Sequence, residues 1–284
     1  MVAKPRGIAK PSTLTCMAST TLRIASLQPS ITLTLASLNR LDILCAHTKY
    51  CLEALPSLAT LNLPILQDSW TTTTDELTAV APDLVIASVP YRLESLAAIL
   101  KSGIPLLALA PHTLSDVLHD TRLIARQVDR AAEAESIIET FQQTILATQK
   151  TTSCQPKPTV YCEEWGNPLI HSQPWIAELI ATSGGTFVGT PGIQTTPEAI
   201  VAADPDVLLF AWCGAGDRVP LNRVIEQRNW HHLRAVRNHR VYCIPDEYLN
   251  TPAIPSLTDG LAHLAAAIHP DLFPTAPRLI SLTR

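Results

Sequence analysis

The sequence predicts an α/β fold: two similar lobes with parallel-sheet α/β folds, joined by one long backbone helix. Two observations predict it, an internal duplication and a long amphipathic segment between the copies. The copies are DELTAVAPDLVIA, from Asp75 to Ala87, and EAIVAADPDVLLF, from Glu198 to Phe210. Each places an acid seven residues before a proline and ends in a continuous apolar run. Runs without alternation are typical of strands buried on both faces of a parallel sheet.

Composition and charge exclude several classes of protein. Of the 284 residues, 46% are hydrophobic and 16% are charged, which excludes general disorder. A formal net charge of −4 without a basic stripe argues against nucleic acid as a partner. The sequence contains no run of 18 or more apolar residues, so no membrane span is predicted. The seven cysteines form no CxxC pair, so neither a disulfide framework nor a zinc site is expected.

We assign residues 1–20 to a disordered leader and residues 21–114 to an N-terminal α/β lobe. The duplicated helix begins at Thr74 or Asp75, where a carboxylate meets the positive end of the helix dipole. Pro82 ends this helix, because proline lacks the N–H that would continue it. The expected elements are a strand at residues 23–27, a helix at 31–38, the duplicated helix, its strand at 84–87 and a strand at 104–110.

Residues 115–150 are assigned to a linking backbone helix. Neither glycine nor proline interrupts residues 115–148, so an unbroken helix would extend about 50 Å at about 1.5 Å per residue. We expect such a rod to act as a semi-rigid hinge. Its apolar residues are spaced for one helical face: Leu118, Ile124, Val128, Ala131, Ile138, Phe141 and Ile145.

Residues 151–284 are assigned to a C-terminal α/β lobe. Pro197 and Glu198 repeat the helix start, and Pro205 repeats the helix end. Strand and helix alternate again, as in the first lobe. The expected elements are a strand at residues 159–162, a helix at 175–182 ended by Gly184-Gly185, a strand at 186–188, the duplicated helix with its strand at 207–210, and a strand at 240–244.

The ligand site is expected between the lobes, in the loops that follow the carboxyl ends of the strands. Aromatic residues make up only 5% of the chain, yet several follow predicted strands. Flat apolar faces with a polar tip suit a large, partly apolar ligand, and each adds about 1 kcal/mol beyond area burial. The candidate ligand-binding residues are Tyr50, Trp70, Tyr91, Trp165, Trp212, Asp246 and Tyr248.

Other conspicuous residues have structural interpretations. Trp175 and Trp230 are expected to pack helices, and His231-His232, among Arg228, Arg234 and Arg237, is expected on a solvated face. His47 is interpreted as a solvent-facing donor, with metal ligation as the alternative. No glycine-rich nucleotide loop, nucleophile elbow or HExxH helix occurs, so we expect no catalytic residues, no resident metal and no cofactor. Cys45, His47 and Glu163 are the only loose candidates for a metal-dependent enzyme.

These segments resemble a known family over roughly residues 22–270. The motifs are RIASLQPSITLTLASL, EEWGNPLIHSQPWIAELIATSGGTFVG, PEAIVAADPDVLLF and PSLTDGLAHLAAAIHP, in this order. They are similar to the cobalamin-binding member of the helical-backbone substrate-binding proteins, which serve ABC importers of cobalamin, haem and iron-siderophores. The resemblance implies a monomer that holds a corrinoid between its lobes and delivers it to the importer's membrane subunits.

The resemblance also implies roles for individual residues. Trp70, Tyr50 and Trp165 match the family's aromatic residues at the ligand. Asp75 or Glu76, with Glu198 on the other lobe, matches the paired acids that engage arginines of the importer. Without a partner, an acid at a helix start already stabilises the helix dipole by about 0.3–1 kcal/mol.

Two departures from the family pattern keep alternatives open. Cobalamin-type relatives often carry an arginine where this chain has Ser256. The family acts in the periplasm or at the cell surface, but the basic residues at the N-terminus are not followed by an apolar stretch. A cytoplasmic corrinoid carrier or sensor is therefore one alternative. Ferric-siderophore or haem binding by the same fold is another, although Arg92 and Arg218 are the only arginines expected near the site. A metal-dependent enzyme is the third.

Overall fold

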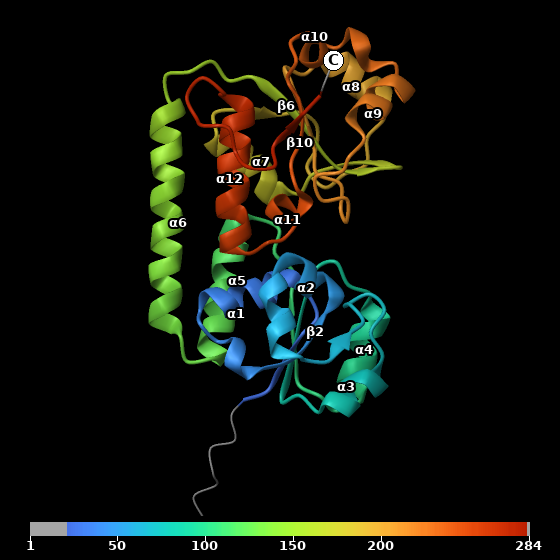
Figure 1. Ribbon diagram of the computed structural model, residues 1–284, viewed down its shortest axis with the longest axis vertical. Helices are drawn as coiled ribbons and strands as arrows, with labels where there is room; N and C mark the ends of the chain where they lie inside the picture. The colour runs from blue at the N-terminus through green and yellow to red at the C-terminus, as the bar shows by residue number, and fades with distance from the viewer. Residues whose placement is uncertain (1–21, 283–284) are drawn as a thin grey trace, which may run out of the picture.

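The computed structural model describes residues 22–282, which form two lobes stacked one above the other (Figure 1). The N-terminal lobe holds a five-stranded, all-parallel sheet in the order β3-β2-β1-β4-β5. The C-terminal lobe holds a six-stranded sheet in the order β11-β10-β9-β6-β7, and β8 also pairs with β6. The predicted fold class, two α/β lobes with parallel sheets, is confirmed. The leader assigned to residues 1–20 lies outside the described residues.

In the N-terminal lobe, β1 is buried along its whole length and β4 along all of it except its first residue, as their unbroken apolar runs predict. Pro29 begins the first helix, where its missing N–H costs nothing. The elements are β1 (Ile24–Ser26), α1 (Pro29–Ser37), η1 (Leu41–Ile43), β2 (Leu44–Thr48), α2 (Lys49–Ala54), η2 (Pro56–Leu61), β3 (Ile65–Leu66), α3 (Thr74–Val80), β4 (Leu84–Ser88), α4 (Leu93–Lys101) and β5 (Leu106–Leu109).

The C-terminal lobe departs from a purely parallel sheet, because β7 and β11 pair antiparallel at its two edges. Neither strand was predicted from the sequence. The elements are β6 (Thr159–Gly166), β7 (Leu169–His171), α7 (Pro174–Thr182), β8 (Thr186–Phe187), α8 (Pro197–Ala203), β9 (Val207–Phe210), α9 (Leu221–Gln227), η3 (Trp230–His232), α10 (Arg234–Arg237), β10 (Val241–Cys243), α11 (Asp246–Leu249), α12 (Ile254–Ile268) and β11 (Ile280–Ser281).

The duplicated segments have the same local structure. Helices α3 and α8 are both seven residues long, with Asp75 and Glu198 at the second position of each. Both helices end at a left-handed residue, Ala81 with φ 49° and Asp204 with φ 39°. The proline that follows prevents the helix from continuing.

The aspartate of each Pro-Asp pair connects two neighbouring strands. Asp83 Oδ2 accepts a hydrogen bond from the backbone N–H of Arg23, and Asp206 Oδ2 accepts one from that of Thr159, both at 2.8 Å. The backbone N–H groups of Asp83 and Asp206 in turn donate to the carbonyls of Arg23 and Thr159, both at 2.9 Å. These contacts lie at the amino edge of each sheet and set the register of its two central strands.

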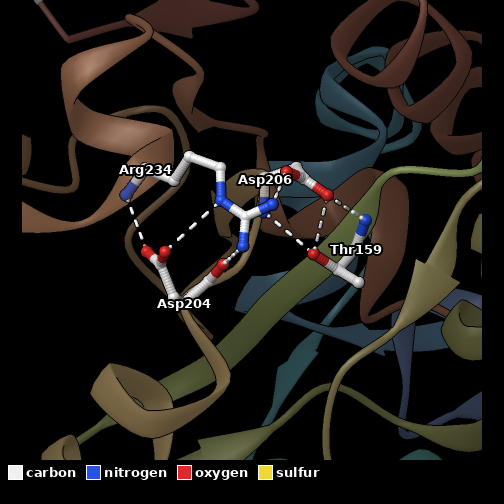
Figure 2. Close-up of polar contacts among 4 residues, drawn as sticks. All are labelled: Thr159, Asp204, Asp206 and Arg234. Atoms are coloured by element: carbon white, nitrogen blue, oxygen red, sulfur yellow. Dashed lines mark hydrogen bonds and ion pairs between the residues drawn. The ribbon is translucent and has the colours of Figure 1, made fainter.

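An arginine completes this arrangement in each lobe. Figure 2 shows Arg234 between Asp204 and Asp206, with its guanidinium 2.8 Å from Asp206 Oδ1 and 3.3 Å from Asp204 Oδ2. Arg234 also donates to the Asp204 carbonyl at the end of α8. In the other lobe, Arg23 donates to the carbonyls of Val80 and Ala81 at the end of α3. Both arginines therefore satisfy carbonyls that the helix end leaves without a partner.

The linking segment is helical, but it consists of two helices, α5 (Leu114–Gln127) and α6 (Ala131–Thr152), so the prediction of one unbroken rod is wrong. The helix breaks although neither glycine nor proline is present. Asp129 takes a left-handed backbone with φ 54°, which aspartate tolerates better than most residues. Val128 is buried in the core of the N-terminal lobe, and its carbonyl accepts a hydrogen bond from Arg40.

The two linking helices each contact both lobes. The start of α5, at Leu114 and Val117, packs into the core of the C-terminal lobe, whereas Ile124 packs into that of the N-terminal lobe. Helix α6 begins at the N-terminal lobe with Ala134 and reaches the other core with Phe141. Figure 1 shows α6 along one side of the molecule. A pair of packed helices, rather than a single rod, thus couples the lobes.

Candidate functional site

The carboxyl edges of the two sheets face each other. Ser30, which follows β1, and Ser88, which ends β4, line a small cavity together with Pro252, which precedes α12. The fourth wall comes from α5 and includes Asp120. In Figure 1, α11, which follows β10, lies at the lower end of the upper lobe, and α2, which follows β2, lies at the upper end of the lower lobe. The loops that follow the strands of both lobes therefore lie where the lobes meet, as the sequence predicts for the ligand site.

Two candidate aromatic residues of the N-terminal lobe are exposed at this edge. Trp70, in the loop after β3, is 49% exposed, although its backbone is fixed by hydrogen bonds to Asp68 (3.0 Å) and from Ser95 (3.1 Å). Tyr50, in α2, is 37% exposed, and the Lys49 ammonium lies 4.7 Å from its ring centroid. Such side chains on a fixed backbone are suited to stack on a flat ligand at low entropic cost.

Tyr91, the third candidate of this lobe, is half-buried. It packs against the core cluster that includes Leu27, Ala87 and Leu96. Its ring therefore covers the lobe's own core at the end of β4, and less of it remains for a ligand than of Trp70.

On the C-terminal lobe, Trp165 is the exposed aromatic residue. It lies at the end of β6 and is 45% exposed, and its indole N–H donates to the Asn167 carbonyl at 3.0 Å. Asn167 belongs to the turn between β6 and β7, so the turn sets the orientation of the indole.

Trp212 follows β9 and is only partly exposed. Its indole N–H donates to Glu163 Oε1 at 2.8 Å, and its ring lies directly on Gly166. A Cβ at Gly166 would approach the ring to 2.5 Å, so only glycine permits this contact. Trp212 thus joins the end of β9 to the β6–β7 turn.

Tyr248 is engaged mainly within its own lobe. Its ring lies 4.7 Å from the His263 ring, and the Arg278 guanidinium lies 5.7 Å from its centroid. Arg278 also forms ion pairs with Asp217 (2.8 Å) and Glu247 (2.6 Å). These contacts attach the C-terminal strand β11 to the lobe.

Two partly buried acids lie at the same edge as the C-terminal aromatic residues. Asp246 accepts hydrogen bonds from the backbone N–H groups of Gly214 (2.8 Å) and Gly216 (2.7 Å), and Glu164 accepts one from Gln173 (2.7 Å). Burial raises the pKa of both carboxyl groups. Among the described residues, neither acid forms an ion pair with a lysine, arginine or histidine.

A buried charge network, which was not predicted from the sequence, supports Trp212. Glu163 is completely buried, and Arg228 donates to both of its oxygens, at 2.8 and 2.9 Å. The hydroxyl of Tyr161 donates to Glu163 as well. Arg228 is therefore not on a solvated face, where the density of nearby charges placed it. The available signal was an acid within the apolar strand TVYCEEW, since a buried carboxylate requires a partner.

The candidate docking acids differ in their surroundings. Asp75 and Glu198 are exposed, whereas Glu76 is half-buried and accepts a hydrogen bond from the Gln67 backbone at 3.0 Å. Helices α3 and α8, which carry these acids, both lie on the side of the molecule away from α6 (Figure 1). Asp75 rather than Glu76 is therefore the counterpart of Glu198.

The residues weighed for an enzyme do not come together. His47 is buried in β2, and its Nδ1 lies 2.9 Å from the Thr48 carbonyl. The prediction that His47 faces solvent is therefore wrong. Cys45 is in the same strand, whereas Glu163 belongs to the other lobe. No group of three or more histidines, cysteines or acids within residues 22–282 could hold a metal ion. In the same part of the chain, no helix is long and apolar enough to cross a membrane. Trp175 and Trp230 are buried, as predicted.

Comparisons with known proteins agree on the family. A family model described as "Periplasmic binding protein" matches residues 24–248. An uncharacterized ABC transporter substrate-binding lipoprotein of Bacillus subtilis (strain 168), YvrC, is 25% identical over 212 residues. The matched region covers 70% of this chain and 66% of that protein, just under two thirds of its length.

Two solved structures share the fold over nearly their whole length. A periplasmic heme-binding protein from Pseudomonas aeruginosa has a TM-score of 0.82 at 19% identity, covering 92% of this chain and 98% of that one. The periplasmic vitamin B12 binding protein BtuF of Vibrio cholerae has a TM-score of 0.70 at 20% identity, covering 87% and 96%. Likeness at these identities concerns the fold alone. The family model matches residues 24–248, which is most of this chain, and the chain therefore belongs to the periplasmic binding protein family.

Proposed function

We propose that this protein is the solute-binding component of an ABC importer and that it holds a corrinoid of the cobalamin type between its lobes. The observation that carries the proposal is the presence of exposed aromatic residues at both facing carboxyl edges, Trp70 and Tyr50 on one lobe and Trp165 on the other. A large, flat, partly apolar ligand can contact both lobes at once. Binding then requires no chemical step, only a higher affinity of the closed arrangement for the ligand.

The charges at the site favour a corrinoid over haem or a ferric siderophore. Haem carries propionates, and siderophore complexes are usually anionic, whereas the rim of a cobalamin carries neutral amides. Glu164 and Asp246 lie at the C-terminal edge, where neither forms an ion pair among the described residues. Their carboxylates would repel an anionic group. The same oxygens can accept hydrogen bonds from amide N–H groups. Arg92, the arginine expected near the site on the other lobe, is mostly exposed. Its Nε lies 4.0 Å from Glu94 Oε2, so its positive charge already has an acidic neighbour.

The docking surface follows from the duplication. Asp75 and Glu198 occupy the same position of two equivalent helices, one on each lobe, and both side chains are exposed. Two acids in equivalent places suit a pair of membrane subunits that each present basic residues. Charge complementarity of this kind chiefly sets orientation and association rate.

A competition panel tests the proposed ligand. The purified protein is titrated with cyanocobalamin, haemin and a ferric hydroxamate siderophore while tryptophan fluorescence is followed. We expect saturable quenching by cyanocobalamin below about 10 μM, a range that corresponds to roughly −7 kcal/mol or better. A Trp175→Phe variant, changed in a buried helix-packing tryptophan, is the matched control and should bind equally. Saturation by haemin or the siderophore alone would replace the corrinoid with that ligand, and saturation by none would remove the proposal.

A further inference from the structure

We propose that Arg228 is a positioning residue for the ligand-binding surface of the C-terminal lobe. Its pair with Glu163 holds the indole of Trp212 and the end of β6, which carries Trp165 and leads into the β6–β7 turn. This inference rests on the proposed function, because it assigns a role to residues behind the proposed ligand contacts. Neither Arg228 nor Glu163 is itself exposed enough to contact a large ligand, since their side chains are 11% and 0% exposed.

The Glu163 carboxylate accepts hydrogen bonds from three side chains, one of which is the candidate ligand-binding residue Trp212. Arg228 donates to both oxygens, and Tyr161 donates to Oε2. Trp212 donates its indole N–H to Oε1 at 2.8 Å. A carboxylate held by several donors has one orientation available, and Trp212 is fixed through it.

Arg228 also contacts the turn directly. Its second terminal nitrogen donates to the Gly166 carbonyl at 3.2 Å, next to Trp165 in the chain. On its other side, the guanidinium lies 4.8 Å from the centroid of the buried Trp230 ring. One planar cation therefore connects the core of the lobe to the turn and to the end of β9. The ring of Trp212 packs on Gly166, whose carbonyl also accepts the hydrogen bond from Arg228. Trp212 and Arg228 therefore both contact the same residue at the end of β6.

The network differs from a pair that only stabilises the lobe. A buried ion pair contributes little net stability, because desolvation offsets most of the attraction. The Arg234 pair with Asp204 and Asp206 offers the contrast on the same lobe (Figure 2). Arg234 has two carboxylate partners where Arg228 has one, but it is half-exposed, lies at the opposite edge of the sheet and touches none of the proposed ligand-binding residues.

The test combines ligand affinity with a signal from each tryptophan. The protein is labelled with 5-fluorotryptophan, which gives five ¹⁹F resonances for its five tryptophans, assigned through single Trp→Phe variants. In Arg228→Met we expect the Trp165 and Trp212 resonances to shift or broaden while that of Trp70 stays in place. Cyanocobalamin affinity should fall about 10-fold. Arg228→Lys keeps the charge but cannot form the bidentate pair, so it should give an intermediate loss.

Matched variants separate positioning from stability. Arg234→Met should lower the unfolding temperature without changing the affinity or the two resonances. Gly166→Ala changes no charge, yet its Cβ would displace the Trp212 ring, so it should reproduce the effects of Arg228→Met even if that variant fails to fold. Unchanged Trp165 and Trp212 resonances in both Arg228→Met and Gly166→Ala would overturn the inference, as would full affinity in either. A wild-type protein that binds no corrinoid would remove the proposed function, while the ¹⁹F shifts would still decide the positioning.

Discussion

Substitution of Asp120 by asparagine should stabilise the protein at neutral pH. Asp120 lies on α5 at the cavity between the lobes, where Ser30, Ser88 and Pro252 form the other walls. Burial raises the pKa of its carboxyl group from 3.8 to about 6. Ionisation at neutral pH therefore costs free energy in the folded state that it does not cost in the unfolded chain.

The magnitude follows from the shift. Two pKa units correspond to an upper limit of about 3 kcal/mol, and partial solvent access reduces this to about 1–2 kcal/mol. Because the folded-state pKa is raised, the penalty is absent below pH 3.8, grows as the pH rises toward 6 and is complete above it. Asp120→Asn should thus raise the unfolding temperature by about 3–6 °C at pH 7.5 and change it little at pH 4.

Thermal unfolding of the wild type and the variant from pH 4 to pH 8 measures this difference. Asp116 on the same helix is the control, because hydrogen bonds from the backbone N–H groups of His112 and Thr113 lower its pKa. It also completes a capping box with Thr113, so Asp116→Asn should destabilise by about 1 kcal/mol at pH 7.5. An Asp120→Asn variant that is no more stable than the wild type at pH 7.5 would refute the reasoning.

Three further predictions concern the turn around His171 and the docking acids. Burial lowers the pKa of His171, so protonation of the unfolded chain should cost stability as the pH falls below about 6.5, and His171→Gln should flatten urea-derived stability between pH 6.5 and 5. Gly189→Ala should lower the free energy of unfolding in urea by about 3 kcal/mol, because φ is +89° and a Cβ would lie 2.2 Å from the His171 ring. Gly103→Ala is the control: its φ is +80° but no atom lies near the added Cβ, so the loss should be only about 1 kcal/mol. Exchanging Asp75 and Glu198 for alanine should abolish uptake by cells that carry the cognate importer while the affinity in solution stays unchanged, and normal uptake would show that these acids do not dock.

The features that could be predicted are those that local sequence determines. Each copy of the duplication contains a helix start, a proline and an apolar run within 13 residues. Local sequence therefore predicts the helix and the strand that the structure shows in both copies. The places of Trp70 and Trp165 at the ends of strands could also be predicted, since loops after parallel strands share one edge.

The features that were missed depend on residues distant in the chain. The break at Asp129 is accompanied by the burial of Val128 and a hydrogen bond from Arg40, 88 positions away. Arg228 pairs with an acid 65 positions away, and nothing in its own neighbourhood distinguishes it from a surface arginine. Antiparallel edge strands as short as β7 and β11 give no periodic signal of their own.

The central claim is that one ligand contacts both lobes at once, and calorimetric titration of single and double alanine variants of Trp70 and Trp165 tests it most directly. Cyanocobalamin is the titrant, because it is the proposed ligand. Each single substitution should lower the affinity about 10-fold, or about 1.4 kcal/mol, and the double variant about 100-fold. Wild-type affinity in either single variant would mean that the ligand is held by one lobe alone, which would contradict the account.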